Sequence, residues 1–123
     1  MGKTVAVIGA SHDRRKYGNK ALRAFRNRGY TVVPINPAGG EIENEAAYPS
    51  VLDYPGTIDE ATVYVPPHVG AALMPELAKK GIAKVWLNPG ADGREVVARA
   101  RAVGLSPVLA CSILGIGESP GDY

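Results

Sequence analysis

The chain contains a single cysteine, Cys111, and only two histidines, His12 and His68. One thiol cannot form an internal disulfide, and two isolated histidines do not match the ligand spacings of metal sites, so we predict no metal. Cysteine usage of this kind is typical of a reducing compartment. No apolar run approaches the roughly 18 residues of a membrane span, and the basic residues that follow the first apolar run argue against a secretory signal. We therefore predict a cytoplasmic protein.

The chain also lacks a large excess of positive or negative charge. The sequence has 14 lysines and arginines against 12 acidic residues, a formal net charge of +2. This balance excludes a nucleic-acid or membrane-surface binder that works by bulk charge, so any anion site must be local. Hydrophobic residues make up 46% of the 123 positions, enough for one buried core, and we predict a single domain over residues 1–123.

Short β-branched runs alternate with helical patterns along the chain. The runs have no polar alternation, as expected of strands covered on both faces; they lie at residues 4–9, 31–35, 62–65, 84–87 and 107–111. Helices are predicted from an N-cap near Asn19 to Gly29, from His68 to Lys80 with a kink or reset at Pro75, and after a capping-box-like pair at Asp92 and Glu95. Residues 39–60 predict only a short strand and one helical turn. The alternation predicts an α/β, Rossmann-like three-layer sandwich with a mostly parallel sheet of five or six strands.

Small, kinked or polar residues follow each predicted strand. Ligands of open parallel sheets bind at the carboxyl ends of the strands, so these turns mark the candidate rim. The same residue types also serve ordinary turns, and a single turn would carry little weight. The turns are Gly9-Ala10-Ser11, Asn36-Pro37, Pro66-Pro67-His68, Asn88-Pro89-Gly90 and Ser112.

The first turn differs from that of a dinucleotide-binding domain. Such a domain has G-x-G-x-x-G after the first strand and an acidic residue after the second, and the sequence has neither. Ordinary NAD binding is therefore disfavoured, while NADP stays open. The loop nevertheless suits a polyphosphate, because Gly9 allows close approach, Ser11 supplies a hydroxyl, and a helix N-terminus follows. Arg14, Arg15 and Lys16 either contact the phosphates or form a solvated charge run.

Catalytic motifs are missing. Asp13 stands where G-x-S-x-G requires glycine, and no P-loop pattern occurs. No carboxylate is placed in the sequence to orient His12 or His68, and Cys111 fits a small buried hydrophobe better than a reactive thiol. No catalytic residue is predicted.

Seven motifs, in order along nearly the whole chain, resemble a known family. They are VIGAS at residues 7–11, YGNK at 17–20, GYTVVPINP at 29–37, YPSV at 48–51, VYVPP at 63–67, WLNPGA at 86–91 and ACSI at 110–113. Together they resemble the small stand-alone CoA-binding proteins, which are similar to the N-terminal domain of the succinyl-CoA synthetase alpha subunit.

The resemblance implies that coenzyme A lies across the predicted rim. It places the phosphates on the first turn and its loop, the nucleotide along Asn36-Pro37, the adenine against residues 65–67 and the pantetheine beside residues 88–90. The sequence departs from the synthetase relatives after Pro37, where Ala38 replaces a lysine, so a phosphate contact is lost or moves to Arg14, Arg15 or Lys16. The phosphorylated histidine of the synthetase belongs to a separate domain for which 123 residues leave no room, and ligase activity is not expected.

These observations predict a small non-catalytic or accessory module that binds coenzyme A or an acyl-CoA. The predicted cofactor-binding residues are Gly9, Ala10, Ser11, Arg14, Arg15, Lys16, Tyr17, Asn19, Asn36, Pro37, Val65, Pro66, Pro67, Asn88, Pro89 and Gly90. An NADP-dependent or acyl-transfer enzyme using His68 or Cys111 is the main alternative, and a mixed disulfide between Cys111 and CoA is a variant. Expected partners are a small nucleotide ligand and either an enzyme subunit or further copies of the chain, with no nucleic acid and no membrane.

Overall fold

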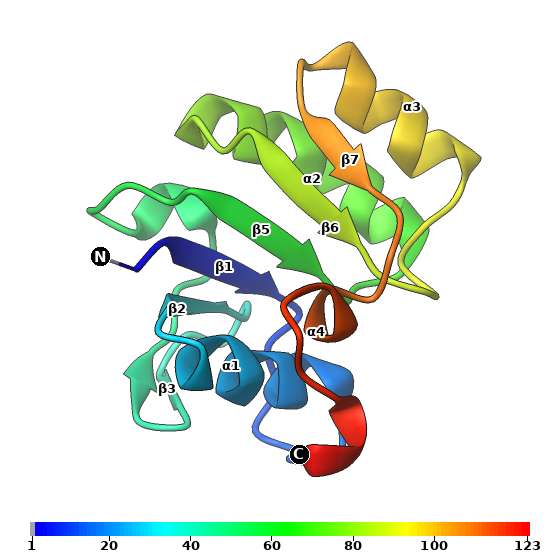
Figure 1. Cartoon of the computed structure of the whole chain (residues 1–123). Coiled ribbons are helices and arrows are strands. Elements are labelled where there is room, and N and C mark those ends of the chain that lie inside the picture. The colour runs from blue at the N-terminus through cyan, green and yellow to red at the C-terminus, as the bar shows by residue number, and fades with distance from the viewer. Residues whose placement is uncertain (1) are drawn as a thin grey trace.

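A central sheet of five parallel strands organises the computed structural model, which describes residues 2–123 (Figure 1). The strands follow the spatial order β2-β1-β5-β6-β7. Their bounds are Thr4–Ile8 for β1, Thr31–Ile35 for β2, Glu60–Val63 for β5, Lys84–Leu87 for β6 and Ser106–Val108 for β7.

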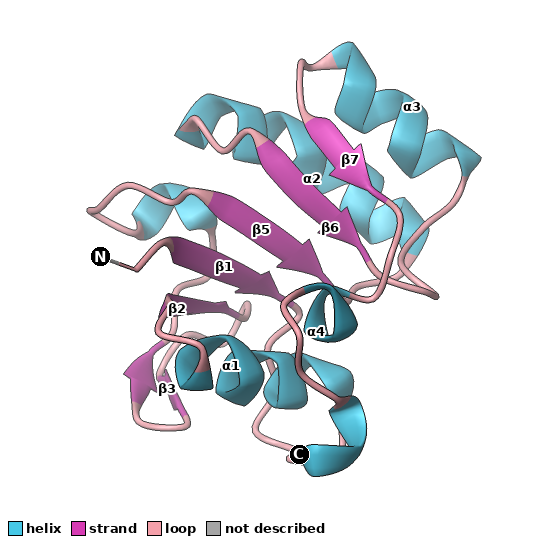
Figure 2. Cartoon of the chain, viewed as in Figure 1, coloured by secondary structure: helices cyan, strands magenta, loops and turns pink. Residues whose placement is uncertain are grey.

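Helices cover both faces of this sheet (Figure 2). One face carries α1 (Tyr17–Asn27) and the short α4 (Ser112–Gly115), and the other carries α2 (Pro67–Lys80) and α3 (Arg94–Ala102). Side chains of β1 alternate between the two cores: Val5 and Val7 belong to the same core as Phe25 of α1, while Ile8 belongs to the core that contains Met74 of α2. The predicted three-layer α/β fold with a parallel sheet is therefore confirmed.

The bounds of three strands differ from the sequence prediction: β1 ends one residue early, at Ile8, and β5 and β7 differ more. The third parallel strand, β5, begins at Glu60 rather than Thr62, because the Glu60 carboxylate is buried and accepts a hydrogen bond from Trp86 Nε1 at 2.8 Å. Because Glu60 is charged, the pattern of apolar residues did not predict it as part of the strand. Tyr64 consequently lies beyond the strand, at the carboxyl edge of the sheet. The last strand ends at Val108, since the chain turns away to place Cys111 at the N-cap of α4.

The helix starts also need correction. Helix α1 begins at Tyr17 with Lys16 at its N-cap, and Asn19 is buried in the first turn. Helix α2 begins at Pro67, where the fixed φ of proline suits a first turn, and it continues through Pro75 instead of resetting there. Helix α3 begins at Arg94, so Asp92 does not cap it.

The weakly predicted segment at residues 39–60 forms a small hairpin and a 3₁₀ turn, in line with the short strand and helical turn expected there. Strands β3 (Glu41–Ile42) and β4 (Glu45–Ala46) are antiparallel, and Glu43 and Asn44 between them have φ values of 53° and 66°. This is the conformation of a tight type I′ turn. The 3₁₀ turn spans Val51–Asp53. Within residues 2–123, no helix has the length and hydropathy that a bilayer crossing requires.

The buried Glu60–Trp86 pair provides a test of the sheet. Phenylalanine at position 86 keeps the ring in the core but cannot donate to the Glu60 carboxylate, so we expect Trp86→Phe to lower the free energy of unfolding by about 2 kcal/mol. Urea denaturation measures this. Lys3 lies 3.9 Å from the same carboxylate and its side chain is 65% exposed, so Lys3→Ala should cost less than about 1 kcal/mol. Equal losses in the two variants would contradict this account.

Candidate functional site

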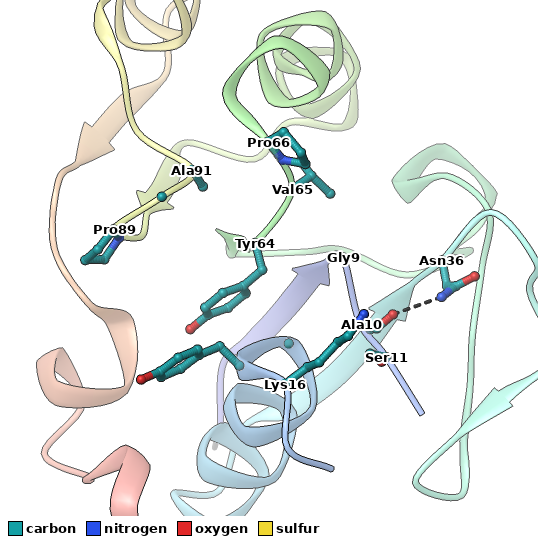
Figure 3. A pocket seen from close by; sticks show the side chains of 13 residues that line it. Gly9, Ala10, Ser11, Lys16, Asn36, Tyr64, Val65, Pro66, Pro89 and Ala91 are labelled. Atoms are coloured by element: carbon teal, nitrogen blue, oxygen red, sulfur yellow. Dashed lines mark hydrogen bonds between the residues drawn. The ribbon is translucent and has the colours of Figure 1, made fainter. Parts of the chain in front are cut away.

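The strand order creates a crevice at the carboxyl edge of the sheet. The chain passes from β1 to β2 on one side and later to β5 on the other, so the exits of β1 and β5 diverge to opposite faces. Open α/β sheets bind ligands at such a switch point. A cleft of about 640 Å³ lies there, which we call the main cleft (Figure 3). Its lining comes from four exits and one helix start: Gly9, Ala10, Ser11, Lys16, Tyr17, Gly18, Asn36, Tyr64, Val65, Pro66, Pro89, Gly90 and Ala91.

Two glycines allow backbone segments to approach one another closely at this cleft. Gly9 has a φ of 89°, and a Cβ at this position would lie 3.1 Å from Val65 and 3.2 Å from the backbone of Tyr64. A Cβ at Gly18 would overlap the carbonyl oxygen of Gly9. Helix α1 therefore starts directly against the exit of β1, which only a residue without a side chain permits.

Backbone donors at the floor of the cleft are partly used by the fold. The N–H groups of Gly9 and Ala10 both donate to the carbonyl oxygen of Ile35 at 3.2 Å. The N–H groups of Ser11, Tyr17 and Gly18 have no acceptor within residues 2–123. Together with the positive end of the α1 dipole, these three groups can receive an anion.

The three basic residues of the first loop have different surroundings. Arg14 Nε donates to Glu43 at 3.1 Å, and Arg15 pairs with Asp13 at 3.0 Å. The hydrogen bond from Arg15 lowers the pKa of Asp13 to about 2. Neither arginine lines the main cleft, whereas Lys16 does. Lys16 is thus the cation of this loop that faces the crevice.

Asn19 holds the loop to its neighbours from inside the protein. Its Nδ2 donates to the Ser11 carbonyl oxygen at 2.8 Å and to Glu43 at 3.1 Å, and its Oδ1 accepts from Arg23 at 2.7 Å. The side chain is fully buried, so it supports the loop and does not line the cleft. The hydrogen bond from Asn19, followed by that from Arg14, lowers the pKa of Glu43.

Two smaller cavities adjoin the main cleft. A second cavity of about 320 Å³ shares Tyr17, Tyr64 and Pro89 with it, and is completed by Asn88, Cys111, Leu114 and Pro120. A third cavity of about 150 Å³ shares Gly9 and Val65 with the cleft and runs between Pro37 and α2. Because each smaller cavity shares lining residues with the main cleft, the three spaces lie next to one another along the exits of β2, β1, β5 and β6.

A family model for the CoA binding domain matches residues 3–116. The chain belongs to the CoA-binding domain family. The resemblance drawn from the sequence motifs is confirmed by this match, which covers nearly the whole chain.

Several relatives of this chain are much longer enzymes, and the chain matches only part of each. The chain is 32% identical to the alpha subunit of acetate–CoA ligase (ADP-forming) I from Pyrococcus furiosus, over 96% of this chain and 29% of that one. It is 38% identical to acetate–CoA ligase (ADP-forming) II from Archaeoglobus fulgidus, over 65% of this chain and 12% of that one. The chain thus spans a third or less of these relatives' length. A hypothetical protein from Pyrococcus horikoshii has a similar structure, with 31% identity and a TM-score of 0.85 over 92% of this chain and 80% of that one.

The fold of this CoA-binding domain gathers many of the residues predicted from the sequence. The main cleft takes Gly9, Ala10, Ser11, Lys16, Tyr17, Asn36, Val65, Pro66, Pro89 and Gly90. Asn88 lines the second cavity and Pro37 the third. Arg14, Arg15, Asn19 and Pro67 line none of the three cavities. Whether any of these residues contacts a cofactor stays a prediction.

Sequence reasoning missed three residues that line the main cleft, Gly18, Tyr64 and Ala91. The motifs at residues 17–20, 63–67 and 86–91 contain all three, but membership of a motif did not show which of its residues face the cleft. Tyr64 was assigned to a strand, and the glycine was taken for a loop residue. The two residues considered as catalytic alternatives lie in different surroundings. Cys111 is half-buried in the second cavity, whereas His68 is exposed in the first turn of α2 and lines none of the three cavities.

The Glu43 carboxylate that braces the loop makes stability depend on pH. Because its pKa is lower in the folded state than the ordinary 4.5, the ionised form stabilises the fold above about pH 4.5, and this contribution is lost as the pH falls through the folded pKa. We expect Glu43→Gln to be about 1 kcal/mol less stable than the natural protein at pH 7. The difference should nearly vanish at pH 3. Urea denaturation at pH 7, 5 and 3 measures it, and a constant difference across this series would rule out the charge as its cause.

Proposed function

We propose that the chain binds coenzyme A or an acyl-CoA in the main cleft, as a small accessory module that performs no chemistry itself. The observation that carries this proposal is the coincidence of two independent features. The segment matched by the CoA-binding family includes all four strand exits around the cleft. The cleft itself lies at the β1/β5 switch point, where its free N–H groups and Lys16 suit a polyphosphate.

In this proposal the phosphates lie against the start of α1. The unpaired N–H groups of Ser11, Tyr17 and Gly18 donate to phosphate oxygens, and Lys16 adds a charge-assisted contact. Lys16 takes the place of the lysine that synthetase relatives carry after the proline of the second turn. Arg14 and Arg15 are paired with acidic residues, so we assign them a smaller part.

The remaining parts of the ligand follow the rim. Asn36 and Pro37 lie along the nucleotide, and the apolar walls formed by Val65 and Pro66 suit the adenine ring. The pantetheine arm runs toward Pro89 and Gly90, beside the second cavity. Asn36 keeps this floor in place, since its Nδ2 donates to the Ala10 carbonyl oxygen at 2.9 Å (Figure 3).

We further propose that the module works in the cytoplasm beside an enzyme subunit that uses the bound CoA. A similar protein is the alpha subunit of an acetate–CoA ligase, and the family relationship supports an analogous arrangement here. An assembly of several copies of the chain is the other arrangement we consider.

Ligand binding tests the proposal directly. CoA should release or absorb heat in calorimetry and raise the melting temperature, because a concentration 100-fold above Kd adds about 2.7 kcal/mol of stability. NADP⁺ provides the control, since it also carries an adenosine diphosphate with an additional ribose phosphate, at the 2′ rather than the 3′ position, and lacks the pantetheine arm. Absence of both heat and a melting shift with CoA, or tighter binding of NADP⁺, would overturn the proposal.

A lysine variant tests the place of the phosphates. We expect Lys16→Ala to weaken CoA binding about tenfold, because a hydrogen bond between charged groups contributes about 1.5–3 kcal/mol. Its Kd should also depend less steeply on salt concentration. Lys79→Ala removes an exposed lysine from the last turn of α2 and should leave Kd unchanged. If both variants bind CoA as the natural protein does, the phosphates lie elsewhere.

A further inference from the structure

Four polar side chains form a hydrogen-bonded chain behind the main cleft. Thr62, Asn88 and Ser112 are buried, and Tyr64 lies at the cleft end of the series. Asn88 Nδ2 lies 2.8 Å from Thr62 Oγ1, Thr62 Oγ1 lies 2.8 Å from Ser112 Oγ, and Ser112 Oγ lies 3.0 Å from the Tyr64 hydroxyl. The proposed binding of CoA assigns no role to this series.

The direction of the protons in the series follows from one backbone contact. The Ser112 N–H donates to Asn88 Oδ1 at 2.8 Å, which fixes the orientation of the amide. Asn88 Nδ2 therefore donates both its protons, one to Thr62 Oγ1 and one to the Val63 carbonyl oxygen at 3.0 Å. A buried hydroxyl needs an acceptor for its own proton. Thr62 must donate to Ser112, and Ser112 must donate to Tyr64.

The proton of Tyr64 is left without a protein acceptor among residues 2–123. Its oxygen accepts from Ser112, so the remaining hydrogen points into the open space in front of it. Burial raises the pKa of Tyr64, and the phenol stays protonated at neutral pH. The main cleft therefore contains a hydrogen-bond donor whose direction the interior of the protein sets.

Tyr64 points into the main cleft (Figure 3) and also lines the second cavity, so it lies between the two spaces. Beyond it the second cavity is walled by Pro89, Leu114 and Pro120. The residues that line this cavity include no charged side chain. A ligand group that passes Tyr64 thus enters a space suited to a small uncharged substituent.

We propose that the Tyr64 hydroxyl donates a hydrogen bond to the thioester carbonyl of an acyl-CoA whose short, neutral acyl group occupies the second cavity. This inference rests on the proposed binding of CoA and specifies its form. A thioester carbonyl accepts a hydrogen bond and brings no donor of its own, which complements a phenol already used as an acceptor. Free CoA lacks this carbonyl, and an amide of the pantetheine arm would bring an N–H that also needs a partner.

A cycle of two proteins and two ligands tests the contact. Acetyl-CoA and S-ethyl-CoA have the same two-carbon substituent and differ in the carbonyl oxygen. We expect the natural protein to bind acetyl-CoA about fivefold more tightly than S-ethyl-CoA, a typical contribution of one hydrogen bond. In Tyr64→Phe this preference should disappear, while S-ethyl-CoA retains its affinity within about twofold. Tyr30→Phe removes a hydroxyl near the opposite edge of the sheet and should keep the fivefold preference.

The outcomes separate this inference from the proposed function. If no CoA ligand binds the natural protein, the proposed function fails. If CoA binds but Tyr64→Phe weakens CoA, S-ethyl-CoA and acetyl-CoA equally, the hydroxyl contacts the shared part of the ligand and the acyl inference is wrong. Equal affinity of the natural protein for acetyl-CoA and S-ethyl-CoA also overturns it.

A second measurement needs no variant and covers the case in which Tyr64→Phe does not fold. Acetyl-CoA labelled with ¹³C at the carbonyl gives an infrared band that moves to lower frequency when a donor binds the oxygen. We expect the band to lie lower in the complex than the band of an equally labelled, uncharged thioester such as S-ethyl thioacetate in an apolar solvent, where no donor is present. A bound band at the apolar-solvent frequency would show that no protein donor contacts the carbonyl.

Discussion

The contact between Gly9 and Gly18 is the constraint on which the site depends. The carbonyl of Gly9 lies where a Cβ of Gly18 would be, so the exit of β1 and the start of α1 meet as bare backbone. Because of this close approach, the free N–H groups of Tyr17 and Gly18 lie in the same cleft as the β5 exit. A side chain at Gly18 would separate these two elements, and a side chain at Gly9 would press against Val65 and the Tyr64 backbone at the β5 exit.

Most charged side chains near the crevice are paired with one another, and one of them, Lys16, faces the main cleft. Glu43 sits in a left-handed turn of the β3–β4 hairpin and receives hydrogen bonds from Asn19 and Arg14, so it ties the hairpin to the first loop. Asp13 holds Arg15 in the same way. These pairs neutralise most of the loop, and the positive potential at the cleft comes from Lys16 and the helix start. A domain of nearly balanced charge can thereby hold a local anion site.

The buried series of polar side chains stabilises the core and also orients one hydrogen-bond donor at the surface. Unpaired hydroxyl and amide groups in a core cost about 1–3 kcal/mol each, but Thr62, Asn88 and Ser112 satisfy one another. The same bonds attach α4, through Ser112, to the exits of β5 and β6. Their order leaves one donor at the rim, so the interior determines the direction of a surface group.

The sequence alone predicted the layered α/β fold, the four strand exits that line the main cleft, and the family. Hydrophobic periodicity and the glycine, proline and asparagine residues of turns are local signals. The runs at residues 31–35 and 84–87 accordingly match β2 and β6 at both ends. It could not reveal that Glu60 is a strand residue, that Asn19 supports the loop from within, or that Tyr64 faces the crevice. Each of these depends on a partner far away in the chain: Trp86 for Glu60, Glu43 for Asn19 and Ser112 for Tyr64. Only tertiary structure brings such partners together, because a side chain's burial and its hydrogen bonds are set by neighbours in space and not by neighbours in sequence.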